Sequence, residues 1–453
     1  MTKQALILAA GEGTRMKSAL PKVLHQAAGQ PLLNHVTDAA AKAGVDDLIV
    51  VVGHGAEEVK AALPAHARSV LQAEQLGTGH AVQMAEALIQ GEALVLILCG
   101  DAPLLRPETL QELMDVHQAA GHAATVLSAR LDNPFGYGRI LRDEDNRLLG
   151  IVEEKDADAG QKAVTEINSG TYCFTGKALL EVLPRLSNNN RQREYYLTDT
   201  LALLRESGEG VGVHCLTDPE EIMAVNSRAQ LAQVEEIFRR RINRCHMEAG
   251  VTLIHPENTY IGPRVTIGRD TVIEPGVILE GTTLIGEDCT IGQNSRLTNT
   301  TLGRGVHITQ STLCDSSVDD ESTIGPYAYL RPGSRIGKRV RIGDFVEVKK
   351  SVIGDDSKAA HLSYIGDAEV GRNVNIGCGV VFVNYDGKKK SKTMVGDNAF
   401  VGSNVNLVAP VTVEAGAFIA AGSTITKNVP ADALAIARER QRNIEGWSKK
   451  SSE

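Results

Sequence analysis

The sequence contains few cysteines, and they are not grouped. Seven occur among 453 residues, an odd number, and no two stand in CxxC spacing. This distribution implies neither a disulfide framework nor a zinc cluster. We expect buried thiols in a reducing compartment. The cysteines are Cys99, Cys173, Cys215, Cys245, Cys289, Cys314 and Cys378.

Long hydrophobic runs and an excess of positive charge are also missing. The first apolar stretch, residues 5–10, is too short and wrongly flanked for a signal peptide. No run approaches the ~18 apolar residues that a membrane-spanning helix needs. The 47 Lys and Arg residues against 56 Asp and Glu give a net charge of −9, which argues against broad binding to nucleic acid or anionic membranes. The sequence therefore predicts a cytoplasmic protein without nucleic-acid or membrane partners.

Two kinds of pattern alternate over residues 3–225. Short β-branched runs such as 5–8 and 94–98 are separated by helical patterns such as 31–43. This alternation is typical of βαβ units, with helices on both faces of a largely parallel sheet. We therefore predict an α/β domain over residues 1–226, built on a doubly wound, Rossmann-like sheet.

A six-residue period replaces this pattern in the second half of the chain. Apolar residues at helical spacing first predict a linker helix over 227–250, with Gly250 placed to end it. The period predicts short strands and corners, with three units in each triangular coil, over residues 251–453. We expect a left-handed parallel β-helix of hexapeptide repeats, whose flat faces favour association as a homotrimer. The first repeating aliphatic residues are Ile261, Ile267, Ile273, Leu279, Ile285, Ile291 and Leu297, each with a small residue two positions earlier.

A glycine-rich turn follows the first predicted strand. Its free backbone N–H groups are suited to cradling phosphate, and Lys22 follows a few residues later, where its ammonium could reach the same anion. The spacing fits neither the dinucleotide fingerprint nor the P-loop, so a purely structural bend remains an alternative. The segment reads LAAGEGTRMKS and is followed by PKVL.

These two motifs resemble the signature of sugar-phosphate nucleotidyltransferases. The resemblance implies in-line attack of a sugar 1-phosphate on the α-phosphorus of a nucleoside triphosphate, with Mg²⁺, Arg15 and Lys22 spreading the developing charge. It also implies that UTP and the nucleotide sugar contact Leu8, Ala9, Ala10, Gly11, Gly13, Thr14, Lys22, Gln72, Gly77, Thr78, Cys99, Gly100, Asp101, Gly138, Glu153, Asn168 and Asn226.

Asp101 and Asn226 are the magnesium ligands that the resemblance implies. Asp101 follows a predicted strand, where an open α/β sheet binds its ligands, although an aspartate there is also a common turn or helix cap. Asn226 precedes the linker helix and has a helix N-cap as its alternative role.

His361 is the candidate base of the repeat domain. It stands in KAAHLSYIG, at a corner of the predicted coils and not at an inward aliphatic position, although a lone histidine at a turn is often only a surface residue. Arg331, Lys349, Tyr364 and Asn375 lie one or more coils away and could converge on one face. Two cations, a phenol and an amide suit a sugar phosphate.

Nearly the whole chain resembles the bacterial bifunctional N-acetylglucosamine-1-phosphate uridyltransferase/glucosamine-1-phosphate acetyltransferase family. The resemblance implies that the repeat domain acetylates glucosamine 1-phosphate with acetyl-CoA, and that the first domain couples the product to UTP, giving UDP-N-acetylglucosamine and pyrophosphate. Because histidine titrates near pH ~6.5, His361 can accept the proton of the attacking amine. Lys390 aligns with a sugar-phosphate contact, within a lysine-rich loop that has solvent-exposed charge as its alternative. The implied acetyl-CoA contacts are Cys378, Asn384, Tyr385, Ser403, Ala421 and Arg438.

Cys378 departs from the family pattern, because it stands where an alanine is expected in the coenzyme A channel. No Cys-His-Asp arrangement supports covalent acyl transfer, so we expect this thiol to pack and not to attack.

Two other functions remain open. In the first, the repeats serve only for trimerisation or effector binding, and the nucleotidyltransferase site is the one active site; His361 and its basic neighbours argue against this hypothesis. Alternatively, the chain resembles non-catalytic subunits of translation-factor exchange complexes that pair the same two folds. Retention of Arg15, Lys22, Asp101 and Asn226 argues against that reading.

Overall fold

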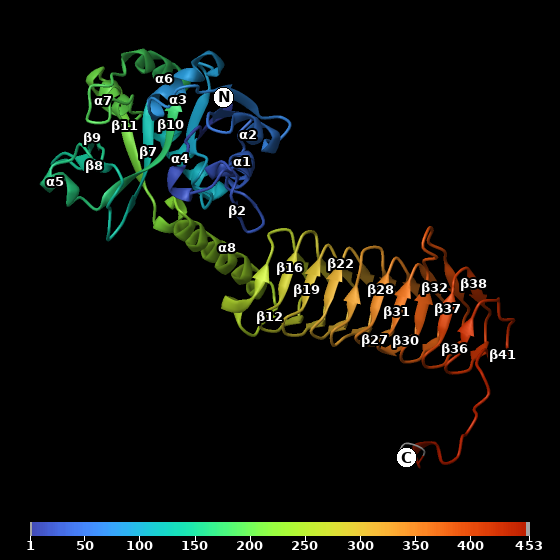
Figure 1. Cartoon of the computed structure of the whole chain (residues 1–453). Helices are drawn as coiled ribbons and strands as arrows, with labels where there is room; N and C mark the ends of the chain where they lie inside the picture. The colour runs from blue at the N-terminus through green and yellow to red at the C-terminus, as the bar shows by residue number, and fades with distance from the viewer. Residues whose placement is uncertain (1, 450–453) are drawn as a thin grey trace. The chain divides into compact units, whose positions relative to one another are not determined.

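The computed structural model describes residues 2–449, which divide into two compact units, the first ending at Phe238 and the second beginning at Arg239 (Figure 1). Within the described residues, no helix combines the length and the hydropathy needed to cross a bilayer. All seven cysteines are free. The expectation of buried thiols holds for Cys173 and Cys289, whereas Cys215, Cys245 and Cys378 are exposed.

The first unit is built on one sheet of mostly parallel strands. Its main path runs β11-β7-β10-β6-β1-β4-β5, and β10 is antiparallel to both of its neighbours in that path. Alternate residues of β1 enter two different cores: Ala5 and Ile7 one, Leu6 the other. A strand buried on both faces is typical of a doubly wound sheet, as predicted. The strands are β1 (Lys3–Ala9), β4 (Asp47–Val52), β5 (Arg68–Leu71), β6 (Leu94–Cys99), β7 (Ala124–Arg130), β10 (Glu166–Thr175) and β11 (Val211–Cys215).

Helices cover both faces of this sheet. The side chains of α1 (Leu32–Lys42), α2 (Ala56–Ala62) and α4 (Pro107–Ala120) enter one core. Those of α3 (Thr78–Met84), α6 (Gly176–Val182) and α7 (Asp199–Glu206) enter the other. This two-sided burial explains the apolar character of the central strands, and it confirms the predicted α/β fold.

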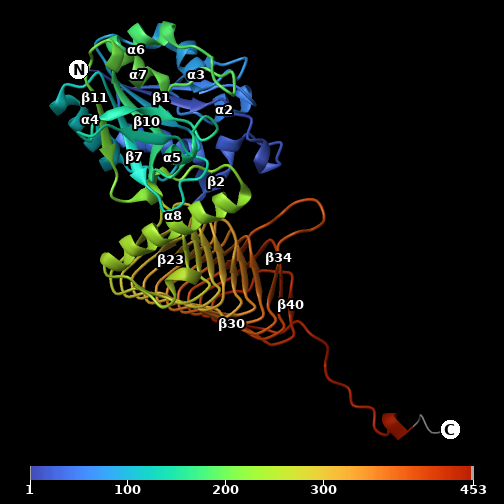
Figure 2. The same cartoon turned by 90° about the vertical axis from the view of Figure 1, so that its left-hand side faces the viewer.

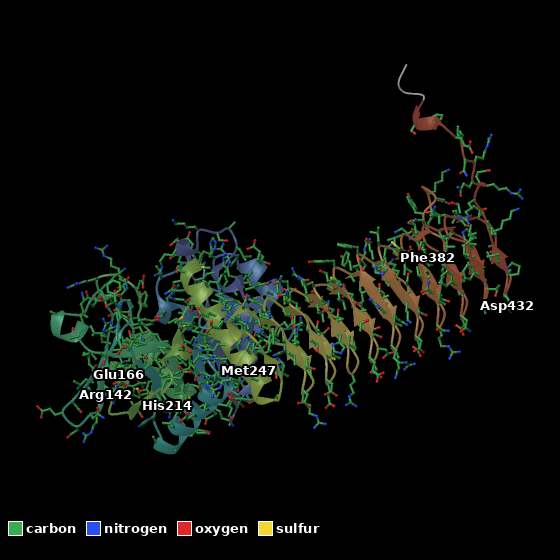
Figure 3. All side chains as sticks on the ribbon, turned by 90° about the horizontal axis from the view of Figure 1, so that it is seen from below. Arg142, Glu166, His214, Met247, Phe382 and Asp432 are labelled. Atoms are coloured by element: carbon green, nitrogen blue, oxygen red, sulfur yellow. The ribbon has the colours of Figure 1, made fainter. Side chains whose placement is uncertain are left out.

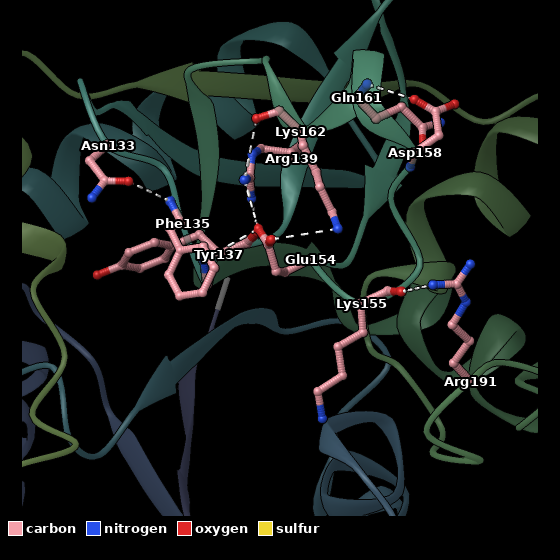
Figure 4. A network of polar contacts seen from close by, with 11 residues as sticks. Asn133, Phe135, Tyr137, Arg139, Glu154, Lys155, Asp158, Gln161, Lys162 and Arg191 are labelled. Atoms are coloured by element: carbon pink, nitrogen blue, oxygen red, sulfur yellow. Dashed lines mark hydrogen bonds and ion pairs between the residues drawn. The ribbon is translucent and has the colours of Figure 1, made fainter.

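A small lobe branches from the sheet at β8 (Arg139–Arg142), β9 (Leu148–Val152) and α5 (Ala159–Lys162). Figure 4 shows Arg139 at its centre, where the guanidinium is buried and donates to Glu154 over 2.7 Å. Asp158 caps α5 by accepting from the backbone N–H of Gln161 over 2.8 Å. The N–H of Gly136 donates to the same Glu154 carboxylate over 3.3 Å, which ties the loop at 133–138 to the lobe.

Helix α8 (Arg228–Glu248) passes from the first unit into the second. The division between the two units falls inside this helix, after Phe238. Gly250 follows the helix in a left-handed conformation (φ 93°), which glycine adopts without steric cost. The domain limits 1–226, 227–250 and 251–453 stay a prediction.

The second unit is a parallel β-helix of three sheets, as the six-residue period predicts. We call them the first sheet (β12 to β41, eleven strands), the second sheet (β13 to β40, ten strands) and the third sheet (β14 to β38, nine strands). The chain passes from the first sheet to the second at what we call the first corner, and from the second to the third at the second corner. The stacked coils are visible in Figures 1 and 2.

Five strands of the first sheet and four of the second position the candidate site of this unit. The first sheet contributes β27 (Arg341–Asp344), β30 (Lys358–His361), β33 (Asn375–Ile376), β36 (Phe400–Val401) and β39 (Phe418–Ile419), and it ends with β41 (Leu434–Ala435). The second contributes β25 (Tyr329–Leu330), β28 (Glu347–Lys349), β31 (Tyr364–Gly366) and β34 (Val381–Val383). Between β34 and β35 (Thr393–Val395), the predicted loop projects from the coils (Figure 2).

The repeating aliphatic side chains fill the interior of the coils. Ile273, Ile291 and Phe382 are completely buried, the last of these labelled in Figure 3. The small residues two positions before the aliphatic ones are buried as well, and many carry hydroxyls that join neighbouring coils. Ser357 Oγ, for example, donates to the carbonyl of Gly371 over 2.8 Å and accepts from the N–H of Val374 over 2.9 Å. Hydrogen bonding makes these hydroxyls compatible with a dry interior.

Candidate active sites

A cleft of about 280 Å³ opens at the carboxyl ends of β1 and β6, where an open α/β sheet binds ligands. Most of the residues predicted to contact UTP line it: Leu8, Ala9, Ala10, Gly11, Lys22, Gln72, Gly77, Thr78, Cys99 and Asp101. Four lining residues were not predicted, namely Val23, Gln75, Ala81 and Glu194. Val23 directly follows Lys22, and Gln75 and Ala81 stand within three residues of predicted ones, but only the fold brings Glu194 to this cleft.

The glycine-rich turn packs tightly against Lys22. Gly13 has a left-handed backbone (φ 68°), and a Cβ atom there would lie 2.6 Å from Lys22 Cβ. A larger residue would therefore strain the backbone and displace the lysine. Thr14 and Arg15 follow in the short helix η1 (Thr14–Met16), and both are exposed beside the cleft.

Lys22, Asp101 and Asn226 meet although they lie far apart in the sequence. Lys22 Nζ forms an ion pair with Asp101 and donates to Asn226 Oδ1 over 3.1 Å. The side chains of Lys22 and Asp101 are only 13% and 15% exposed. Two side-chain oxygens of the kind that Mg²⁺ prefers thus point at the Lys22 ammonium. A Mg²⁺ ion held by two such oxygens takes its remaining ligands from waters and phosphate oxygens. Among residues 2–449, no cluster of three or more His, Cys, Asp or Glu side chains offers a metal site.

The structure also decides between the two roles considered for Asn226. Helix α8 begins at Arg228, and Ser227 Oγ accepts from the N–H of Gln230 over 3.2 Å. Ser227 is therefore the N-cap, which leaves the Asn226 side chain to accept from Lys22.

The residues predicted to hold the amino-sugar adjoin this cleft. A Cβ atom on Gly138 would lie 3.3 Å from Glu153 Oε2, and the carbonyl of Gly138 accepts from the N–H of Asn168 over 2.8 Å. Burial raises the pKa of Glu153, and Thr198 donates to its carboxylate over 3.4 Å. The cluster therefore combines three predicted residues with Thr198, which no sequence pattern had indicated.

Cys99 lines the cleft at the end of β6, and Gly100 follows it directly. Cys99 Sγ contacts the carbonyl of Gly170 at 3.5 Å, and burial raises the pKa of the thiol to about 12. The thiol is therefore protonated at neutral pH and unreactive. A Cβ atom on Gly100 would lie 3.1 Å from the carbonyl oxygen of Leu8, so the two strand ends approach closely only because this residue is glycine.

In the β-helix, His361 is paired with an aspartate that the sequence did not reveal. His361 Nδ1 lies 2.6 Å from Asp344 Oδ1, and the two residues stand opposite each other in the register of β27 and β30. The hydrogen bond from His361 lowers the pKa of Asp344, so the carboxylate stays ionised and holds the proton on Nδ1. The Nε2 atom is then the basic one. The sequence signal for this pair was the spacing of 17 residues between Asp344 and His361, which is the length of one coil.

A polar cluster gathers on the second sheet and its corner. Lys349 Nζ lies 3.5 Å from Asp367 Oδ2, and Asn384 Nδ2 donates both to Asp367 over 2.5 Å and to the Tyr364 hydroxyl over 3.3 Å. The amino groups of Lys349 and Lys390 are neighbours, and the hydrogen bond and positive charge of Lys349 lower the pKa of Lys390.

Arg331 belongs to the same face of the β-helix as this cluster. Arg331 Nη1 donates to Glu347 Oε1 over 2.8 Å, and both residues lie on strands of the second sheet or at its corner. Asn375 lies elsewhere, on β33 of the first sheet. Four of the five predicted sugar-phosphate contacts thus share one face within a chain, and Asn375 does not.

Four of the predicted acetyl-CoA contacts lie along the first corner, in the coils that follow His361. Cys378, Ser403, Ala421 and Arg438 are all exposed there. Backbone hydrogen bonds stack these corners, with the N–H of Asn404 bonded to the carbonyl of Cys378 over 2.7 Å. The other two, Asn384 and Tyr385, stand at the second corner, where Asn384 joins the polar cluster described above.

Comparison with known proteins identifies both halves. Residues 5–199 match the model of the MobA-like NTP transferase domain. Residues 283–309 match the hexapeptide repeat of succinyl-transferase, and residues 392–427 match the bacterial transferase hexapeptide of six repeats.

Relatives of known family align over essentially the whole chain. The chain is 60% identical to the bifunctional protein GlmU of Alkaliphilus metalliredigens over 447 residues, which cover 99% of this chain and 98% of that protein. It is 56% identical to the bifunctional protein GlmU of Clostridioides difficile, over 100% of this chain and 99% of that protein. The resemblance predicted from the motifs is confirmed, and the chain belongs to the family of the bifunctional protein GlmU.

Proposed function

We propose that the chain catalyses two successive transfers that produce UDP-N-acetylglucosamine. The second unit moves the acetyl group of acetyl-CoA to the amine of glucosamine 1-phosphate. The first unit moves UMP from UTP to the resulting N-acetylglucosamine 1-phosphate and releases pyrophosphate. Membership of a bifunctional family and the presence of a separate polar site in each unit support this assignment. The cytoplasm, where its small-molecule substrates are available, stays the predicted location.

In the first unit, an oxygen of the sugar phosphate attacks the α-phosphorus of UTP and pyrophosphate leaves. Arg15 and Lys22 hold the triphosphate, and the glycine-rich turn donates backbone N–H groups to it. Bound Mg²⁺, held by Asp101 and Asn226, supplies further positive charge for the phosphates. The convergence of Asp101 and Asn226 on one point supports this ligand pair. Gly138, Glu153 and Asn168 bind the amino-sugar, while Gln72, Gly77 and Thr78 contact the nucleotide.

In the second unit, His361 acts as the general base. The amine of glucosamine 1-phosphate attacks the carbonyl carbon of the thioester while Nε2 of His361 accepts the proton of that amine. The carbon–sulfur bond breaks, and the coenzyme A thiolate takes up a proton to leave as the thiol. The contact between His361 and Asp344 supports this role, because it directs the basic nitrogen away from the aspartate.

The two substrates of this step occupy different parts of the β-helix. Arg331, Lys349, Tyr364 and Lys390 bind the sugar phosphate, whose negative charge attracts the adjacent amino groups of Lys349 and Lys390. Acetyl-CoA lies along the first corner. The four coils between His361 and Arg438 span roughly 19 Å at about 4.8 Å for each coil, a length suited to an extended pantetheine arm.

The acetyl-transfer site is shared between subunits of a homotrimer in this proposal. Asn375 lies on the first sheet, whereas the other four sugar-phosphate residues lie on the second sheet or its corner. A neighbouring copy that apposes these two faces unites both groups. The flat faces of stacked coils favour such lateral association.

Two assays on one preparation test the assignment. We expect His361→Ala to abolish thiol release from acetyl-CoA while pyrophosphate release from UTP and N-acetylglucosamine 1-phosphate continues. Unchanged thiol release would remove His361 as the base, whereas no thiol release from the native protein would favour repeats that serve only in assembly. No pyrophosphate release from the native protein would instead favour a regulatory subunit.

A further inference from the structure

A small core packs the first half of α8 against the segments that carry the nucleotidyl-transfer residues. It is separate from the two cores on the faces of the sheet. All of its central members are buried, with at most 5% of any residue exposed to solvent. They are Met16, Ala27, Leu32, Leu104, Val225, Val234 and Ile237.

Three members of this small core adjoin three residues of the proposed transfer site. Met16 follows Arg15 directly, Leu104 stands three residues after Asp101, and Val225 directly precedes Asn226. The N–H of Val225 also donates to the carbonyl of Asp101 over 2.8 Å. The three segments therefore meet on one apolar surface, and Val234 and Ile237 of α8 complete that surface.

Polar contacts fasten the same half of the helix to these segments. Glu235 Oε2 accepts from the N–H of Ala28 over 2.7 Å, and Gln230 Oε1 accepts from the N–H of Asn226 over 2.9 Å. Arg228 Nη1 lies 3.3 Å from Nδ1 of the buried His25, three residues beyond Lys22. Helix α8 thus contacts both the segment that follows Lys22 and the segment that contains Asn226.

We propose that the first half of α8 is a positioning element of the uridyl-transfer centre, with Val234 and Ile237 as its positioning residues. The proposal rests on the proposed function, because it concerns the arrangement of Arg15, Asp101 and Asn226 in that reaction. Removing apolar volume here lets the three segments shift relative to one another. Because a misplacement of about 1 Å can cost roughly 10²-fold in rate, a remote residue can govern the chemistry.

The helix carries its own matched control. Ile237 is buried in the small core, whereas Ile242, five residues later, packs against the core of the β-helix. We expect Ile237→Ala to lower kcat/KM of UMP transfer by about 10–100-fold. It should also weaken Mn²⁺ binding in the presence of UTP, measured by the loss of the free Mn²⁺ signal in electron paramagnetic resonance. Ile242→Ala should change neither quantity more than about twofold.

Circular dichroism and urea unfolding of each full-length variant report whether the first unit is folded, and acetyl transfer reports the same for the second unit, because all of its proposed residues lie there. Ile237→Val, which restores most of the volume, should recover both Mn²⁺ binding and UMP transfer, and Glu235→Ala should reproduce the Mn²⁺ defect without opening a cavity. Native Mn²⁺ binding and UMP transfer in Ile237→Ala would overturn the proposal. Intact Mn²⁺ binding by Asp101→Ala would instead contradict the metal site of the proposed function.

Discussion

Replacing Lys22 by methionine should make the empty nucleotide site bind divalent metal more tightly, although the same change should abolish UMP transfer. In the structure the Lys22 ammonium pairs with Asp101 and donates to Asn226 over 3.1 Å, so it stands at the point where the proposed metal ligands converge. Metal ion and ammonium therefore compete for the same oxygens. Methionine keeps the apolar stem that packs against Gly13 but removes the charge.

The size of the effect follows from the geometry. An ammonium and a carboxylate about 4 Å apart attract by about 4 kcal/mol at an effective dielectric constant of about 20. The side chains of Lys22 and Asp101 are 13% and 15% exposed, so water screens part of this attraction. We therefore expect roughly 1.4–2.8 kcal/mol of competition to disappear, which corresponds to about 10–100-fold tighter metal binding.

Titration with Mn²⁺ in the absence of UTP measures this affinity directly. The matched control is Lys60→Met, because Lys60 pairs with Glu57 on an exposed helix surface and stands outside the cleft. The control should bind Mn²⁺ as the native protein does. Equal or weaker Mn²⁺ binding by Lys22→Met would refute competition between the ammonium and the metal ion.

Three further predictions concern the pair of Asp344 and His361, the buried His117, and the Ser357 hydroxyl inside the β-helix. Asp344→Asn should lower acetyl transfer about 10²-fold and leave UMP transfer unchanged, because an amide cannot fix the His361 tautomer as a carboxylate does. Native acetyl transfer by this variant would contradict a role for Asp344. Burial lowers the pKa of His117 from 6.5 to about 4, so its neutral form contributes stability that is full above pH 6.5 and lost as the pH falls towards 4. Between pH 7 and pH 5, the native protein should lose about 2 kcal/mol more of its free energy of unfolding in urea than His117→Gln does. Ser357→Ala should lower the free energy of unfolding by about 1–3 kcal/mol, because the carbonyl of Gly371 and the N–H of Val374 lose their partner, and exposed Thr266→Ala serves as the comparison.

The sequence by itself determined the two folds and most of the nucleotide cleft. Both folds rest on local periods: alternating strands and helices in the first unit, and an aliphatic residue every six positions in the second. The glycine-rich turn and Lys22 could be recognised for the same reason, since they are close together in the chain. The structure places both at the cleft, and it buries Ile273 and Ile291 as the six-residue period requires.

Tertiary structure alone decided the contacts between distant segments. The pairing of Asp344 with His361 depends on the length of one coil, and nothing local distinguishes that aspartate from others in the repeats. Asn226 and Ser227 are both good N-cap residues, and only the start of α8 at Arg228 showed which one caps the helix. The separation of Asn375 from the other sugar-phosphate residues likewise follows from the sheet that each strand joins. Such contacts arise when packing brings together residues that are far apart in the sequence, and local sequence patterns therefore do not indicate them.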